Sequence, residues 1–191
     1  MLNWLGKILG LPEEFLACSE GQAGGVIQGT ASEATLVALL GAKAKVINRV
    51  QEEHPEWDEA YIISRMVGYT SIQSHSSIER TGLLGEVKLC SLKADPNLQL
   101  RSETLEEAIK QDLADELIPF YAVCILGTTN TCAFDRLDEF GPVANKFNVW
   151  LHVDAPYAGS AFICPEYRHY MKGIEIADSF NFNFDCSAIW L

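Results

Sequence analysis

The sequence predicts an α/β fold in which helices flank a mainly parallel sheet. Three short apolar runs are expected as strands, at Val87–Leu92, Ala122–Leu126 and Val149–Val153. The middle run is apolar throughout, which is typical of a strand that helices cover on both faces. These runs alternate along the chain with segments of helical periodicity, and such alternation favours parallel pairing.

The segments with helical periodicity are Thr35–Val50, Trp57–Val67 and Ser102–Leu117. The first has a broad apolar face, and Thr30 and Ser32 stand just ahead of it as natural helix caps. In the third, four apolar residues recur at helical spacing and are expected on one face: Leu105, Ala108, Ile109 and Leu113. No repeat or linker divides the chain, so residues 1–191 are expected to form a single domain.

Composition narrows the classes of function. The formal net charge is −12 and no run is rich in Lys or Arg, so a nucleic-acid partner is not expected. No apolar run approaches the ~20 residues that a bilayer-spanning helix needs, so no membrane partner is expected. The six cysteines include no Cys-x-x-Cys pair, which predicts free thiols and a reducing, cytoplasmic location.

Candidate site residues occur where parallel strands are expected to end, which is where ligands bind in such sheets. The loop 29–33 precedes the first long helix, and its N–H groups and hydroxyls can hold a phosphate, although such residues are more often only caps. The polar loop 127–131 follows the apolar strand and can equally be a simple turn. Asp154 directly follows another predicted strand, and a buried carboxylate is costly unless it is paired, for example with a cationic heterocycle.

His75 lies among serines and is a further candidate, because an imidazole can stack on an aromatic ring. A surface histidine with ordinary partners is the more common case. A metal site built from His75, His152, Asp154 and His169 is less well supported, because no two of these residues have ligand spacing.

Five stretches of the chain resemble, in order, the motifs of the group II pyridoxal-phosphate-dependent amino-acid decarboxylases: GVIQGTASEATLVALLGAKAK, HSSIERTGLLGEVKL, PFYAVCILGTTNTCAFD, WLHVDAPYAGSAFICPEYRH and ADSFNFN. This family includes the aromatic-L-amino-acid, tyrosine and histidine decarboxylases. Within it, GTTNTCAFD, LLGAKAK and PEYRHYMKGIE look most like the tyrosine decarboxylases of arthropods, with DOPA decarboxylase second. The resemblance implies an incomplete large domain of the type I, aspartate-aminotransferase-like PLP-transferase fold, with pyridoxal 5′-phosphate (PLP) as cofactor.

The resemblance also implies roles for individual residues at the cofactor phosphate and beside it. Ala31 and Ser32 match the positions that hold the phosphate. Thr129 and Asn183 match further cofactor contacts.

Two more residues match groups that act on the cofactor ring. His75 matches the histidine that stacks on the pyridine ring and helps to orient the substrate, so it is the catalytic residue expected here. Asp154 matches the carboxylate that pairs with the pyridinium nitrogen and thereby keeps the ring able to accept an electron pair.

The chain departs from the family pattern at its lysine. In the family, Ser-Phe-Asn-Phe-Asn is followed by Pro-His-Lys-Trp, and this lysine forms a Schiff base with the cofactor. Here Phe184 follows Asn183 directly, so the lysine is absent, and Asn183 could equally match the asparagine beyond the gap. The chain is also expected to lack the first part of the family pattern and its C-terminal small domain. Without the amine, covalent attachment and a proton-handling group are lost.

Two functions are therefore expected as alternatives. One is PLP-dependent decarboxylation of an aromatic L-amino acid, tyrosine or DOPA, to the amine and CO2 by a homodimer, as the resemblance implies. The other is an inactive splice variant, pseudoenzyme or incorrect gene prediction, which at most binds the cofactor or pairs with a full-length subunit. The missing lysine favours the second for the chain as written.

Overall fold

The computed structural model describes residues 1–17 and 23–184. Its helices are α1 (Leu2–Leu9), α2 (Ala31–Glu53), α3 (Glu59–Arg65), α4 (Ser76–Leu84), α5 (Ser102–Ala114) and α6 (Leu137–Lys146). Its strands are β1 (Met66–Ser71), β2 (Lys88–Leu92), β3 (Ile118–Ile125), β4 (Trp150–Ala155) and β5 (Ser179–Phe182). Short 3-10 helices complete the described part: η1 (Glu13–Phe15), η2 (Gly159–Ile163), η3 (Pro165–Met171) and η4 (Ile174–Ile176).

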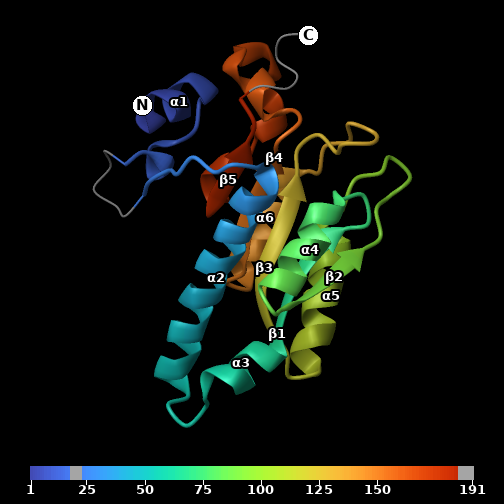
Figure 1. Ribbon diagram of the computed structural model, residues 1–191. Helices are drawn as coiled ribbons and strands as arrows, with labels where there is room; N and C mark the ends of the chain where they lie inside the picture. The colour runs from blue at the N-terminus through green and yellow to red at the C-terminus, as the bar shows by residue number, and fades with distance from the viewer. Residues whose placement is uncertain (18–22, 185–191) are drawn as a thin grey trace.

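The five strands form one sheet in the order β2-β1-β3-β4-β5, and every neighbouring pair is parallel. Helices α2 and α4 cover one face, and α5 and α6 cover the other (Figure 1). All carboxyl ends of the strands therefore lie at one edge, and α2 begins at this same edge (Figure 1). The predicted α/β fold with a parallel sheet is confirmed.

Strand β3 is covered by helices on both faces, which explains why its sequence is apolar along its length. Ala122, Cys124 and Leu126 belong to the hydrophobic cluster under α5 and α6. The alternate residues, Val123 and Ile125, belong to the cluster under α2 and α4. Because side chains of a strand alternate between faces, a strand with a helix layer on each side needs apolar residues throughout.

The predicted elements are confirmed in type, but several boundaries differ, and at one of them two residues were assigned to the wrong element. The second predicted helix was extended to Val67, but α3 ends at Arg65, and Met66 and Val67 begin the central strand β1. Both side chains are apolar and buried, so helical periodicity and a buried strand look alike at this position. Leu113 was expected on the apolar face of α5 and is instead 47% exposed, because the last turn of this helix is exposed to solvent.

Helix α2 starts with a complete capping box. The Thr30 hydroxyl accepts a hydrogen bond from the Glu33 N–H at 3.2 Å, and the Glu33 carboxylate accepts one from the Thr30 N–H at 3.1 Å. These reciprocal bonds fix the first turn of the helix at the carboxyl edge of the sheet.

Two further sequence expectations can be compared with the structure. Among residues 1–17 and 23–184, no helix combines the length and the apolar character that crossing a bilayer requires. Cys90, Cys124, Cys132 and Cys164 are free thiols, whereas Cys18 and Cys186 lie outside the described residues.

Candidate functional site

Asp154 is the central carboxylate of the candidate site. It lies near the end of β4, within the strand and not directly after it, and only 4% of its surface is exposed. Its Oδ1 accepts a hydrogen bond from Nδ2 of Asn181 on β5 at 3.0 Å. Across the described residues, the carboxylate has no cationic partner.

Burial raises the pKa of Asp154 from 3.8 to about 6, and the bond from Asn181 offsets only part of this rise. Desolvation penalises the ionised carboxylate, and a single neutral amide donor compensates for it incompletely. A cation placed against this carboxylate would remove the penalty. The donor set therefore fits a protonated ring nitrogen, which offers one N–H and a positive charge.

The first turn of α2 provides the second part of the site. In the part of the chain that the structure describes, the N–H groups of Ala31 and Ser32 have no acceptor, because the capping box satisfies only Thr30 and Glu33. Free N–H groups at the start of a 23-residue helix, together with the helix dipole, favour an anion such as a phosphate.

Asn181 connects these two parts. Besides its bond to Asp154, its Nδ2 lies 3.4 Å from the carbonyl oxygen of Ala31. The structure thus brings two of the predicted residues, Ala31 and Asp154, into contact with the same amide nitrogen. In the register of β4 and β5, Asn181 pairs with Asp154, so both side chains point to the face that α2 covers.

The loop after β3 lies beside this pair. The Leu126 N–H donates to the backbone carbonyl of Asp154 at 3.1 Å, which joins the ends of β3 and β4. The buried Thr128 hydroxyl accepts a hydrogen bond from the Ala133 N–H at 3.0 Å and lies 2.7 Å from the Thr131 hydroxyl, so it closes the loop. Thr129, the predicted cofactor contact, is exposed on this closed loop.

His75 follows the end of β1 and is the N-cap residue of α4. Its side chain is exposed, and its Nδ1 accepts from the Ser77 N–H at 3.2 Å, so the proton of the neutral ring lies on Nε2. A cavity of about 160 Å³ is lined by His75, Ser71 and Ser91, among others. A larger cavity of about 260 Å³ lies around Asn148 and contains none of the predicted site residues.

Asn183, the last predicted contact, lies just beyond β5 and is partly exposed. Its backbone carbonyl accepts a hydrogen bond from the Ser160 hydroxyl. The asparagine that contacts Asp154 is Asn181, which was not predicted from the sequence. The alternation along Ser-Phe-Asn-Phe-Asn was the available signal, since it places Asn181 and Asn183 on the same face.

A second feature that was not predicted from the sequence is a buried chain of polar groups around His152, two residues before Asp154 on β4. The Trp150 indole N–H donates to Oγ of Ser179 at 2.8 Å, and the same Oγ lies 2.8 Å from Nδ1 of His152. The indole can only donate, whereas the Ser179 hydroxyl can accept from it and still either donate to Nδ1 or accept from it, so both neutral tautomers of His152 fit this geometry. Burial lowers the pKa of His152 to about 3, so the ring is neutral at pH 7.

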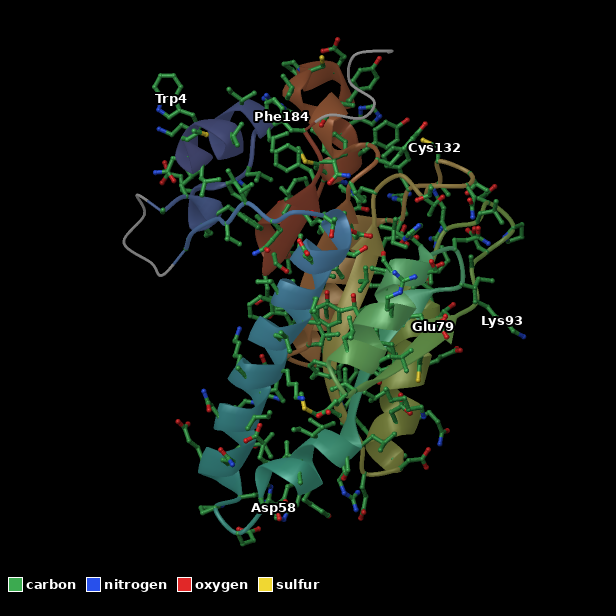
Figure 2. All side chains as sticks on the ribbon, in the orientation of Figure 1. Trp4, Asp58, Glu79, Lys93, Cys132 and Phe184 are labelled. Atoms are coloured by element: carbon green, nitrogen blue, oxygen red, sulfur yellow. The ribbon has the colours of Figure 1, made fainter. Side chains whose placement is uncertain are left out.

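The lysines of the chain lie apart from Asp154. Lys93 points outwards from the loop after β2 (Figure 2). In the described residues, no lysine makes a hydrogen bond or ion pair with Asp154 or Asn181. Five lysines have other partners: Lys43 contacts Gly85, Lys45 contacts Asp178, Lys110 and Lys146 contact Glu106, and Lys172 contacts Asp138.

A buried carboxylate and a helix start, both contacted by one amide at the carboxyl edge of a parallel sheet, are suited to bind a basic ring nitrogen and a phosphate. The sequence profile of the pyridoxal-dependent decarboxylase conserved domain matches residues 1–191. The chain therefore belongs to the family of pyridoxal-dependent decarboxylases.

Several aromatic-L-amino-acid decarboxylases are similar in sequence over the whole chain. That of Drosophila lebanonensis is 72% identical, and the chain covers 49% of it. Those of Drosophila melanogaster and Mus musculus are 67% and 55% identical, with 39% and 42% of their lengths covered. The chain thus spans less than half the length of these relatives. Their alignments run over 199 positions, eight more than the 191 residues of this chain.

Solved structures of decarboxylases have the same fold. The Oryza sativa TDC solved with PLP matches with a TM-score of 0.87 at 35% identity, over 95% of this chain and 39% of that protein. The Catharanthus roseus tryptophan decarboxylase in complex with L-tryptophan matches with a TM-score of 0.84 at 35% identity, over 95% and 38% of the two chains. The predicted PLP-transferase fold is confirmed for the part of the domain that the chain covers.

Proposed function

We propose that residues 1–191 are a single, incomplete PLP-binding large domain of a decarboxylase that converts an aromatic L-amino acid to its amine and CO2. The observation that carries this proposal is the buried Asp154, which has an amide as its only described partner and lies beside a helix start with free N–H groups. Such a carboxylate is poorly stabilised alone and well stabilised by a cationic ring nitrogen.

The chain's residues have distinct tasks in this proposal. Asp154 holds the proton on the ring nitrogen, and the N–H groups of Ala31 and Ser32 bind the phosphate. His75 is proposed to lie against the ring and to orient the substrate. The cofactor, when bound, supplies the electron sink that accepts the electron pair released as CO2 leaves.

Thr129 and Asn183 are proposed as further cofactor contacts. Thr129 lies on the loop that follows β3, and Asn183 lies just past β5, so both belong to the carboxyl edge at which Asp154 is found. Their side chains are partly or fully exposed in the structure, which leaves them accessible to a ligand.

The substrate is proposed to be tyrosine or DOPA. The relatives named aromatic-L-amino-acid decarboxylase support an aromatic substrate, and the motifs GTTNTCAFD and LLGAKAK support the narrower choice.

The protein is further proposed to act as a cytoplasmic homodimer. Large apolar side chains lie exposed near the start of the chain, including Trp4 at 75%, Val26 at 63% and Ile27 at 74%. Exposed apolar groups of this size favour burial against another chain or another part of the protein. Free thiols at the four described cysteines are compatible with a reducing compartment.

One observation supports a second candidate, in which this chain binds the cofactor without turnover. The sequence runs from Asn183 directly to Phe184 where the family pattern has its lysine, and the relatives' alignments contain eight positions without a counterpart here. A chain without this amine is expected to lose turnover by orders of magnitude while keeping the carboxylate and the helix start.

The two candidates are separated by adding PLP to the full chain and measuring CO2 release from L-tyrosine and L-DOPA, in parallel with PLP binding. Turnover that is lost in Asp154→Ala supports the decarboxylase. If the chain binds PLP without turnover, and turnover is restored by inserting Pro-His-Lys-Trp and the following apolar residues after Asn183, the second candidate is supported. A chain that does not bind PLP contradicts both.

A further inference from the structure

Asn181 occupies a position that couples the two halves of the proposed pocket. It is 7% exposed and lies opposite Asp154 in the parallel register of β4 and β5. Its Nδ2 lies 3.0 Å from Oδ1 of Asp154 and 3.4 Å from the carbonyl oxygen of Ala31. One amide nitrogen thus contacts both the buried carboxylate and the first residue of α2.

These contacts fix the orientation of the amide. The carbonyl of Ala31 and the ionised carboxylate of Asp154 can only accept, so the nitrogen of Asn181, which has two hydrogens, must face them. A flipped amide would place its oxygen against two other oxygens. The bond to the carboxylate is charge-assisted and is therefore the stronger of the two.

The consequence is a fixed separation between two groups from distant parts of the chain. Asp154 is on a strand of the sheet and Ala31 begins a helix that packs across its face, and Asn181 links both. A rigid ligand that must meet a carboxylate with one end and helix N–H groups with the other binds best when their spacing is set in advance.

We infer that Asn181 is a positioning residue for cofactor binding, which holds Asp154 at a set distance from the start of α2. This spacing lets the carboxylate bind the ring nitrogen while the helix N–H groups bind the phosphate. This inference rests on the proposed function. It assigns to Asn181 a coupling role that neither Asp154 nor the helix start has alone.

The test compares the binding of PLP and of pyridoxal, which lacks the phosphate, to the full chain and its variants. Asn181→Ala is expected to weaken PLP binding by about tenfold or more, because a hydrogen bond to a charged group is lost. The ratio of the pyridoxal Kd to the PLP Kd is also expected to fall, because phosphate and ring contacts no longer reinforce each other. Asn181→Asp keeps the size but removes the donor, and it is expected to bind at least as weakly as Asn181→Ala.

The matched control is Asn48→Ala, at an exposed asparagine of α2, which is expected to change neither Kd. Melting curves without ligand establish that each variant is folded, and Asn181→Ser, which keeps a smaller donor, replaces any variant that is not. The coupling role would be overturned if Asn181→Ala left the Kd ratio or the PLP affinity unchanged. It would also be overturned if Asn181→Asp bound PLP as tightly as the unmodified chain. Failure of the unmodified chain to bind PLP would instead reject the proposed function, and the inference with it.

Discussion

Replacing Asp154 by asparagine should stabilise the protein without ligand, and the gain should reach its full size above about pH 6. The pKa of Asp154 is raised from 3.8 to about 6 by burial, and this rise corresponds to about 3 kcal/mol that the folded protein loses when the carboxylate ionises. The asparagine keeps an oxygen for Asn181 but buries an N–H without an acceptor, which costs about 1 kcal/mol. The expected net gain for Asp154→Asn at pH 8 is therefore about 2 kcal/mol.

The pH dependence has a definite sign. Because the folded pKa lies above the unfolded value, the native state of the unmodified protein binds more protons between pH 3.8 and about 6, and its stability falls as the pH rises through that window. The advantage of Asp154→Asn should therefore be largest above pH 6 and vanish towards pH 4. The assay is urea denaturation of the full chain and the variant at several pH values, with equal slopes for both.

Asp135 provides a matched contrast. Burial also raises the pKa of Asp135 to about 6, but its two oxygens accept the N–H groups of Leu100 at 2.7 Å and Ile125 at 2.8 Å. An asparagine can accept only one of these bonds and leaves its amide hydrogens facing the other N–H donor, which together cost about 4 kcal/mol. This cost exceeds the about 3 kcal/mol gained by removing the charge, so Asp135→Asn should lower stability by about 1 kcal/mol at pH 8. If Asp154→Asn were also destabilising at pH 8, or if its effect were the same at pH 5, the reasoning about an uncompensated carboxylate would be refuted.

Three further predictions concern the surroundings of the site. Thr30→Ala removes the capping-box acceptor at the start of α2 and should lower the free energy of unfolding by about 1 kcal/mol, measured by urea denaturation against Thr30→Ser, which should match the unmodified protein. Gly127→Ala should be more destabilising than Thr30→Ala, because Gly127 has φ +88° and a Cβ there would lie 2.6 Å from the Cβ of Ala158; equal melting temperatures for both variants would contradict this. In a folded sample, iodoacetamide should label the exposed Cys132, which lies on the outer loop in Figure 2, but not Cys124. The thiol of Cys124 is buried, and this burial raises its pKa. Peptide mass spectrometry measures the labelling of both cysteines, and labelling of Cys124 at a similar rate would contradict the packing of β3.

Much of the fold could be predicted from local patterns. Strand β3 and helix α2 were found because each is long and strongly patterned, with β3 apolar throughout and α2 apolar along a broad stripe. Strand β1 was missed because its sequence combines Gly68, Tyr69 and Thr70, which do not form an apolar run although the whole strand is buried. Helix α6 was missed because Pro142 lies inside it, and proline argues against a helix interior.

The candidate site, like the fold, could be predicted only in part from the sequence. The position of Asp154 at a strand end and the hydroxyls before α2 are local signals, and both could be read from the sequence. The link between them could not, because Asn181 reaches Asp154 through strand register and Ala31 through the packing of α2, over 27 and 150 residues of sequence. Asn183 was predicted from the sequence as a cofactor contact, and that assignment stays a prediction.

A crystal structure of the full chain soaked with PLP would show whether Asp154 and the start of α2 bind the two ends of the cofactor. The expected result has the pyridine nitrogen within hydrogen-bond distance of Asp154, the phosphate on the N–H groups of Ala31 and Ser32, and both contacts of Asn181 retained. Density for the cofactor elsewhere, or a ring nitrogen facing away from Asp154, would contradict the account.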